Sequence, residues 1–265
     1  MHQLAWITSY PQSGCNLAWS LVTGYLVDAP PTEVTSDALL DVAPDLVTLL
    51  CAGRTVPLGD TRPYVVKTQL LPGADIMRHC QEATGKVVYV VRDPRTLIST
   101  NVGAAPPRKD PAQIAHTVAA RLAGTDRPAA GHGSWPQHVR EWTSPERIRQ
   151  YFPNVDGVHV VRFEDLDSDP TAGLHQLIDF LDIPGGTDPD RVRRAVQTWT
   201  ADTIRDAVLE EGLPGVTAFR ADRVRRPALP RSTADIGEAV EAAYRQLLSG
   251  DAELAGLVER FGYPS

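Results

Sequence analysis

A strand, a tight loop and a helix can be recognised near the start of the chain, and this junction limits the fold more than any other segment. The apolar run at 6–8 breaks into a Tyr-Pro-Gln-Ser-Gly turn at 10–14, and apolar residues resume at 17–22. Backbone N–H groups at the start of such a helix can bind a phosphate without a basic side chain, and Gly14 allows a ligand to approach closely. We therefore predict an anion site where a buried strand leads into a helix.

Further β-branched runs alternate with helical patterns along the rest of the chain. Strands are expected at 64–67, 87–91 and 158–161, and helices at 74–81, 94–100, 112–123, 170–181, 236–248 and 252–261. Strands that alternate with helices need crossover connections, so we expect a single α/β domain over residues 1–265, with a central parallel sheet flanked by helices. Ligands of such sheets gather at the carboxyl ends of the strands. A mobile loop is expected at 212–233, where Gly, Pro and Arg cluster.

Composition narrows the classes of function. No apolar run approaches the length of about 18 residues that a membrane span needs, and the N-terminus lacks the pattern of a secretion signal, so we expect a soluble, cytoplasmic protein. The cysteines Cys15, Cys51 and Cys80 are too widely spaced to suggest a disulfide framework or a metal site. A net charge of −7 argues against a nucleic-acid surface, although a local basic pocket could still hold a nucleotide.

A second phosphate-binding pattern follows the strand at 87–91. Arg92 ends the strand, Pro94 begins a helix, and Thr100 lies eight residues after Arg92. Arginine binds two phosphate oxygens at once, and a hydroxyl further along the helix can reach the same group. The alternative is a surface arginine that only ends the strand.

These two patterns resemble those of sulfotransferases that use 3′-phosphoadenosine 5′-phosphosulfate (PAPS), whose loop reads Tyr-Pro-Lys-Ser-Gly-Thr-Thr-Trp. Further segments match in order: Gly-Ser-Trp at 133–135, Phe-Glu-Asp-Leu at 163–166 in place of Tyr-Glu-Asp-Leu, and the closing Glu-Arg-Phe-Gly-Tyr at 259–263. The chain is most similar to bacterial sulfotransferases that tailor glycopeptide antibiotics. The resemblance implies a P-loop-like sulfotransferase fold, PAPS or its desulfonated product PAP as the nucleotide, a small-molecule acceptor and a role in natural-product tailoring.

The resemblance also implies a set of nucleotide-binding residues. An approximate counterpart of the family's closing Arg-Lys-Gly loop lies at 220–231, where arginines either clamp an anion or are merely solvated. The residues expected to bind the nucleotide are Gln12, Ser13, Gly14, Cys15, Asn16, Leu17, Arg92, Thr100, Arg223 and Arg225.

The sequence departs from the family where the chemistry takes place. Gln12 replaces the lysine of the loop, and Gln69 replaces the histidine that activates the acceptor hydroxyl, whereas Lys67 is retained. An amide carries no charge and accepts no proton near neutral pH. We therefore expect Lys67 to stabilise the leaving phosphate, Gln69 to position the acceptor, and the acceptor itself to be acidic, such as a phenol or a hydroxamate.

Other residues could replace the missing base. His132 and His138 are candidates, because the segment before Trp135 lies near the acceptor in the family. Cys15 at the start of a helix could be a nucleophile, because a helix N-terminus lowers the pKa of a thiol. The simpler interpretation is that these residues are buried and structural.

Two other functions remain open. The fold could catalyse another transfer, elimination or cyclisation without PAPS, with Gln12 and Gln69 binding an uncharged substrate. It could also be a non-catalytic protein that binds a nucleotide or a partner. A homodimer is possible, although no interface motif is evident.

Overall fold

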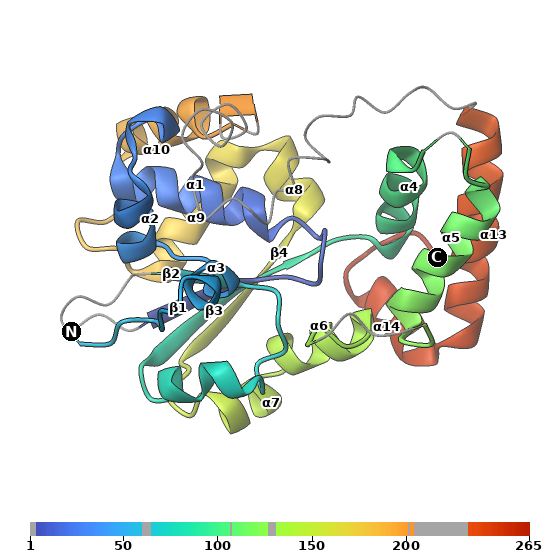
Figure 1. Cartoon of the computed structure of the whole chain (residues 1–265), viewed down its shortest axis with the longest axis horizontal. Helices are drawn as coiled ribbons and strands as arrows, with labels where there is room; N and C mark the ends of the chain where they lie inside the picture. The colour runs from blue at the N-terminus through green and yellow to red at the C-terminus, as the bar shows by residue number, and fades with distance from the viewer. Residues whose placement is uncertain (1–3, 60–64, 107, 127–130, 201, 204–232) are drawn as a thin grey trace.

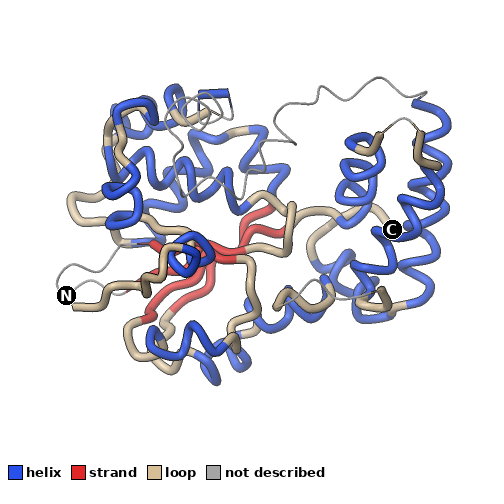
Figure 2. The backbone as a smooth tube through the Cα atoms, in the orientation of Figure 1, coloured by secondary structure: helices blue, strands red, loops and turns tan. Residues whose placement is uncertain are grey.

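The computed structural model describes residues 4–59, 65–106, 108–126, 131–200, 202–203 and 233–265 (Figure 1). A parallel four-stranded sheet of order β2-β1-β3-β4 lies at its centre (Figure 2). The strands are β1 (Leu4–Thr8), β2 (Val65–Thr68), β3 (Thr84–Val91) and β4 (Gly157–Arg162). The predicted parallel sheet, with helices on both of its faces, is therefore confirmed.

Helices cover both faces of the sheet, and a further group of helices lies beyond the point where β3 leads into α4 (Figure 1). The helices are α1 (Cys15–Val27), α2 (Ser36–Val42), α3 (Leu46–Cys51), α4 (Pro94–Ala104), α5 (Pro111–Ala123), α6 (Trp135–Thr143), α7 (Pro145–Tyr151), α8 (Phe163–Ser168), α9 (Pro170–Leu181), α10 (Pro189–Thr198), α13 (Thr233–Gly250) and α14 (Ala252–Arg260). Figure 1 shows α1, α9 and α10 on one side of the sheet, α6 and α7 on the other, and α4, α5, α13 and α14 as a separate layer.

An Asp-Pro pair begins four of these helices: α4, α5, α9 and α10. In each, the aspartate carboxylate accepts a hydrogen bond from an N–H of the first turn, and the proline occupies a position where no helical N–H is needed. This pattern explains why the predicted starts of α4, α5 and α9 lie close to the observed ones, whereas α10 was not predicted. One prediction of helix type is wrong: residues 74–81 contain the 3₁₀ helix Asp75–Cys80 rather than an α-helix.

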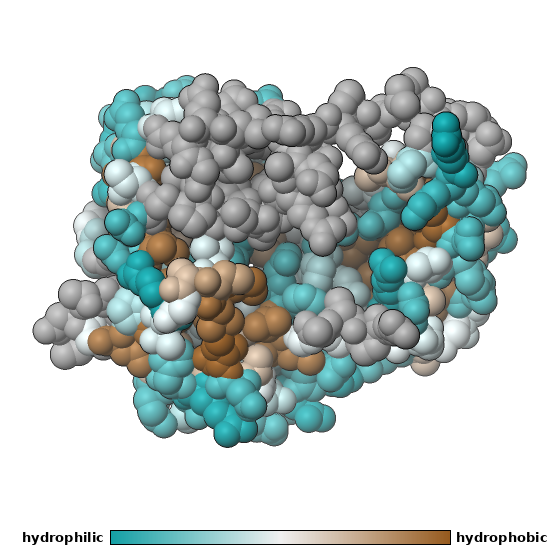
Figure 3. Space-filling view, viewed as in Figure 1, coloured by the Kyte–Doolittle hydropathy of each residue, from teal (hydrophilic) through white to brown (hydrophobic). Residues whose placement is uncertain are grey.

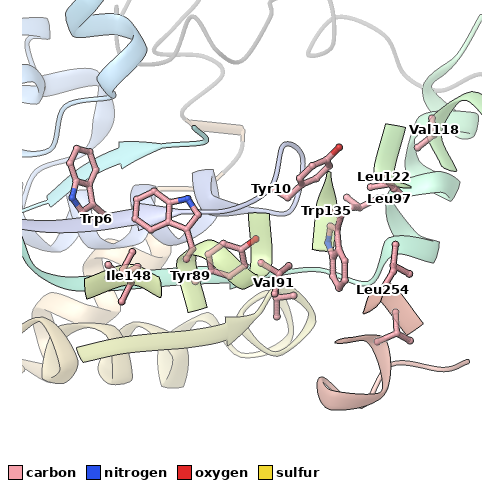
Figure 4. Close-up of a cluster of buried hydrophobic side chains, with 14 of the residues drawn as sticks. Trp6, Tyr10, Tyr89, Val91, Leu97, Val118, Leu122, Trp135, Ile148 and Leu254 are labelled. Carbon is pink, nitrogen blue, oxygen red and sulfur yellow. The ribbon is translucent and has the colours of Figure 1, made fainter. Parts of the chain in front are cut away.

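Two hydrophobic clusters lie on opposite faces of the sheet. Along β1, Leu4 and Trp6 belong to one cluster, whereas Ala5 and Ile7 belong to the other, as the alternation of side chains in a strand requires. Figure 4 shows the first cluster running from Trp6 past Tyr89 to Leu254. This continuous cluster joins the layer of α4, α5, α13 and α14 to the sheet in one α/β domain.

The surface of the view in Figure 3 is mostly hydrophilic, with hydrophobic areas near the centre. Val47 of α3 and Leu58 are the large hydrophobic residues classed as exposed among those described, at 46% and 41% exposure. None of the described helices is both long and apolar enough to cross a membrane.

Candidate active site

The loop between β1 and α1 has a backbone that few residues adopt. Gln12 and Gly14 have positive φ angles of 69° and 98°. A Cβ atom on Gly14 would lie 2.2 Å from Cδ2 of Phe163, the first residue of α8. Glycine is therefore required at position 14 both by its dihedral angle and by the close approach of an aromatic ring.

This loop has unused hydrogen-bonding capacity. Gly14 caps α1 without any side-chain bond to the first turn, so the first N–H groups of a 13-residue helix have no side-chain cap. The hydroxyls of Ser13 and Thr8 are buried and find no hydrogen-bond partner among the described residues. Buried polar groups are normally paired, so the arrangement suits an anionic group of phosphate size.

Arg92 braces the loop from the end of β3. Its Nη1 donates to the backbone oxygen of Gln12 at 3.0 Å, and its guanidinium lies 4.2 Å from the centroid of the Phe163 ring. The Nε atom is buried without a partner in the described part of the chain. Burial lowers the pKa of Arg92, against the opposing effect of Glu164, and the guanidinium stays charged at any physiological pH. A half-buried positive charge therefore lies directly against the loop.

The side chain of Gln12 bonds to α4. Its Oε1 accepts from Nδ2 of Asn101 at 2.6 Å, and the same Nδ2 donates to the backbone oxygen of Leu97 at 2.8 Å. Thr100 is exposed on the same helix. The contact between Gln12 and Asn101 was not predicted, because only the fold brings residues 89 positions apart together.

Lys67 is held by a buried ion pair. Its Nζ lies 2.9 Å from Oδ2 of Asp45, donates to Oδ1 of Asn16 at 2.8 Å, and lies 5.1 Å from the centroid of the Trp19 ring. The two charged side chains are only 3% and 6% exposed. Asp45 caps α3 and also accepts from the backbone N–H of Thr48 at 2.9 Å. The sequence signal for Asp45 is that of a helix cap, and its pairing with Lys67 was missed.

Gln69 and Cys15 meet beside the loop. Nε2 of Gln69 donates to Sγ of Cys15 at 3.5 Å. Cys15 is 1% exposed, and burial raises the pKa of its thiol despite the opposing charge of Lys67. The expectation that the helix start lowers this pKa is therefore wrong, because desolvation of a buried thiolate outweighs the helix dipole. A protonated Cys15 is a poor nucleophile.

Both candidate histidines bond to the backbone of Gln69. Its carbonyl oxygen accepts from Nδ1 of His132 and, at 3.0 Å, from Nε2 of His138. The remaining nitrogen of His138, Nδ1, accepts from the Tyr89 hydroxyl at 3.0 Å. Burial lowers the pKa of His138 to about 3. His138 therefore stays neutral with both nitrogens occupied, whereas His132 is only half-buried.

Comparison with known proteins decides the family. The model of the family described as "Sulfotransferase domain" matches residues 3–211, which is most of the chain. The chain belongs to this family. It is also 25% identical over 183 residues to sulfotransferase 2B1 of Mus musculus, over 68% of this chain and 50% of that protein. The chain thus spans about half the length of this curated relative.

Solved structures agree on the sulfotransferase fold. Retinol dehydratase in complex with retinol and PAP has a TM-score of 0.54 and 14% identity, over 94% of this chain and 82% of that one. The same protein in complex with androsterone and the inactive cofactor PAP has a TM-score of 0.53 and 14% identity, over 92% and 80%. The predicted α/β sulfotransferase fold is therefore confirmed.

Glu164 of α8 joins distant segments of the chain behind the loop. Oε1 of Glu164 accepts from the backbone N–H of Asp93 at 3.3 Å, and Oε2 accepts from the Tyr263 hydroxyl at 3.2 Å. Tyr263 in turn lies under the guanidinium of Arg162, 4.8 Å from the ring centroid. Glu164 thus bonds to the residue that caps α4, the helix that carries Asn101.

The other residues predicted to bind the nucleotide lie away from the loop contacts given above or outside the described residues. Leu17 is partly buried and packs against the hydrophobic cluster beneath α1. Arg223 and Arg225, and the predicted loop up to residue 232, lie outside the described residues. Among the residues that the structure describes, no three His, Cys, Asp or Glu side chains are grouped so as to hold a metal ion.

Proposed function

We propose that this sulfotransferase transfers the sulfo group of PAPS to an acidic hydroxyl of a small-molecule natural product. The observation that carries the proposal is the loop at the start of α1. It combines a helix N-terminus without a side-chain cap, a Ser13 hydroxyl that has no partner among the described residues, and the adjacent Arg92 guanidinium. Backbone donors and an arginine suit the phosphate groups of a nucleotide. Similarity to enzymes crystallised with PAP supports the same nucleotide.

The residues around the loop divide the work between binding and chemistry. Gly14, Cys15 and Asn16 would present the first turn of α1 to the 5′-phosphate of PAPS. Arg92 and Thr100 would hold the 3′-phosphate, as the family resemblance implies. PAPS supplies an activated sulfo group when bound. Lys67 would add positive charge near Asn16, although the buried carboxylate of Asp45 already offsets much of that charge.

The proposed acceptor class follows from this weak ionic assistance. Enzymes stabilise a charge that develops on a leaving group with cations or donors held in place. Gln12 offers an amide that is bonded to Asn101, and Lys67 offers an ammonium that is paired with Asp45. An acceptor that ionises readily needs less help than a neutral alcohol. We therefore propose a phenol or a hydroxamate, in line with the tailoring role that the resemblance to glycopeptide-antibiotic sulfotransferases implies.

Calorimetric titration with PAP tests the nucleotide site separately from the reaction. We expect micromolar binding to the wild type and its loss in Arg92→Ala, because the variant removes the positive charge beside the loop. Arg95→Ala is the matched control: this arginine lies in the first turn of α4, three residues after Arg92, is 40% exposed and pairs with Glu241. The control should bind PAP as the wild type does.

Other outcomes would count against the proposal. If the folded wild type does not bind PAP at millimolar concentration, PAPS dependence is excluded and the fold serves another reaction or a binding role. If PAP binds but no sulfonated product forms from any phenol or hydroxamate, a non-catalytic nucleotide-binding protein is favoured. Circular dichroism of Arg92→Ala distinguishes a loss of binding from a loss of folding.

A further inference from the structure

We propose that His132 is the general base that deprotonates the acceptor in place of the residue at position 69. The inference rests on the proposed function and deepens it, because it assigns the proton acceptor that Gln69 cannot provide. It is carried by the hydrogen bond between Nδ1 of His132 and the backbone oxygen of Gln69.

That bond determines the tautomer of the neutral imidazole. A carbonyl oxygen only accepts, so Nδ1 of His132 must carry the proton, and Nε2 keeps its lone pair. A histidine oriented in this way through Nδ1 is the usual arrangement of an imidazole that accepts a proton at Nε2. His132 is only half-buried, which leaves part of the residue accessible from solvent.

His132 lies in a turn whose backbone is shaped by two glycines. It lies between Gly131 and Gly133, whose φ angles are 83° and 65°, and the backbone oxygen of Gly131 accepts from the N–H of Leu71 at 2.8 Å. A Cβ atom on Gly131 would lie 2.8 Å from Cδ2 of Leu70. The glycine pair therefore allows this turn to lie directly against the segment that follows Gln69.

The position is also suited to the reaction. The backbone of Gln69 bonds to His132, while its side chain bonds to Cys15 at the first turn of α1. A single residue thus links the imidazole to the proposed nucleotide loop. The neighbouring His138 cannot compete for the role, because both of its nitrogens are engaged and it is completely buried.

The proposed step balances as follows. The hydroxyl proton of the acceptor passes to Nε2 of His132 while the acceptor oxygen forms a new bond to the sulfur. The bond between sulfur and the bridging oxygen of the 5′-phosphate breaks, and PAP leaves with that electron pair. His132 then releases its proton to solvent.

Comparing turnover with two phenols of different acidity shows whether His132 acts as a base or has only a structural role. The substitution His132→Asn keeps a donor for the Gln69 carbonyl but removes the proton acceptor, and His116→Asn on α5 is the control. With PAPS and unsubstituted phenol, we expect turnover by His132→Asn to fall by about 10²- to 10⁴-fold. With para-nitrophenol, which is a far stronger acid and is about half ionised near neutral pH, the loss should be much smaller. Equal losses with both phenols, or no loss with either, would overturn the role of His132 and leave the proposed function standing.

A second readout does not depend on turnover. Nitrogen NMR of the labelled wild type, assigned with His132→Asn, reports which nitrogen of the neutral ring carries the proton. We expect the proton on Nδ1; a proton on Nε2 would exclude His132 as the base even in an active enzyme. If PAP binds but the wild type sulfonates no phenol or hydroxamate, the proposed function fails, and the base assignment fails with it.

Discussion

At the scale of the residue, Gly14 is the position where the loop tolerates least change. An alanine there would hold a left-handed φ of 98° and place its Cβ 2.2 Å from the Phe163 ring. That ring also supports Arg92, so it cannot shift without moving the guanidinium. We expect Gly14→Ala to lower the free energy of unfolding by about 1–3 kcal/mol and to abolish PAP binding, measured by urea denaturation and calorimetry.

Gly53→Ala is the matched control for this prediction. Gly53 also has a positive φ, of 66°, but a Cβ atom there would have no neighbour within 4 Å. The free energy of unfolding of the control variant should fall only by the cost of a left-handed backbone at alanine, about 1–2 kcal/mol. The control should bind PAP as the wild type does. Equal PAP binding by the two alanine variants would show that the ring behind Gly14 does not shape the site.

At the scale of the element, the contact between α1 and the end of α10 sets how the first helix lies on the sheet. Gly24 is in the interior of α1, and a Cβ atom on it would lie 2.4 Å from Cδ1 of Trp199. Trp199 is buried and donates from Nε1 to the backbone oxygen of Ala29 at 2.8 Å. Although alanine is the better helix former, we expect Gly24→Ala to destabilise the protein by about 1–3 kcal/mol in urea denaturation, because overpacking outweighs propensity.

The same substitution should have the opposite effect on stability in another helix. A Cβ atom on Gly256 in α14 would meet nothing within 4 Å. Gly256→Ala is therefore expected to stabilise the protein by about 0.5–1 kcal/mol. Stabilisation by Gly24→Ala as well would contradict the close packing of α1 on Trp199.

At the scale of the whole molecule, the buried His138 makes the free energy of unfolding depend on pH. The pKa of His138 is lowered from 6.5 to about 3 by burial, so the unfolded chain takes up a proton at a pH where the folded chain does not. The stability that neutral His138 contributes is fully present above pH 6.5 and is lost as the pH falls toward 3. We expect this loss to reach about 1.4 kcal/mol per pH unit, measured by urea denaturation at a series of pH values.

The control for this acid dependence is His138→Gln. Glutamine can still donate to the Gln69 carbonyl and accept from the Tyr89 hydroxyl, but it has no titration in this range. Its free energy of unfolding should fall less steeply with acid than that of the wild type. His159, whose pKa burial also lowers, contributes in the same direction in both proteins. Identical slopes would show that His138 does not titrate differently on unfolding.

The local features of this protein could be predicted from its residues alone. The strand, loop and helix at 4–27, the Asp-Pro helix starts and the arginine at the end of β3 are set by residues close together in the chain, so propensity and periodicity reveal them. The hydrogen-bond and ion-pair partners of these groups come from the tertiary structure. It pairs Lys67 with Asp45, Gln12 with Asn101 and His132 with Gln69. It also buries Cys15, which raises its pKa rather than lowering it. Such contacts depend on how the elements pack, and no local pattern encodes which distant side chain fills the space beside a strand end.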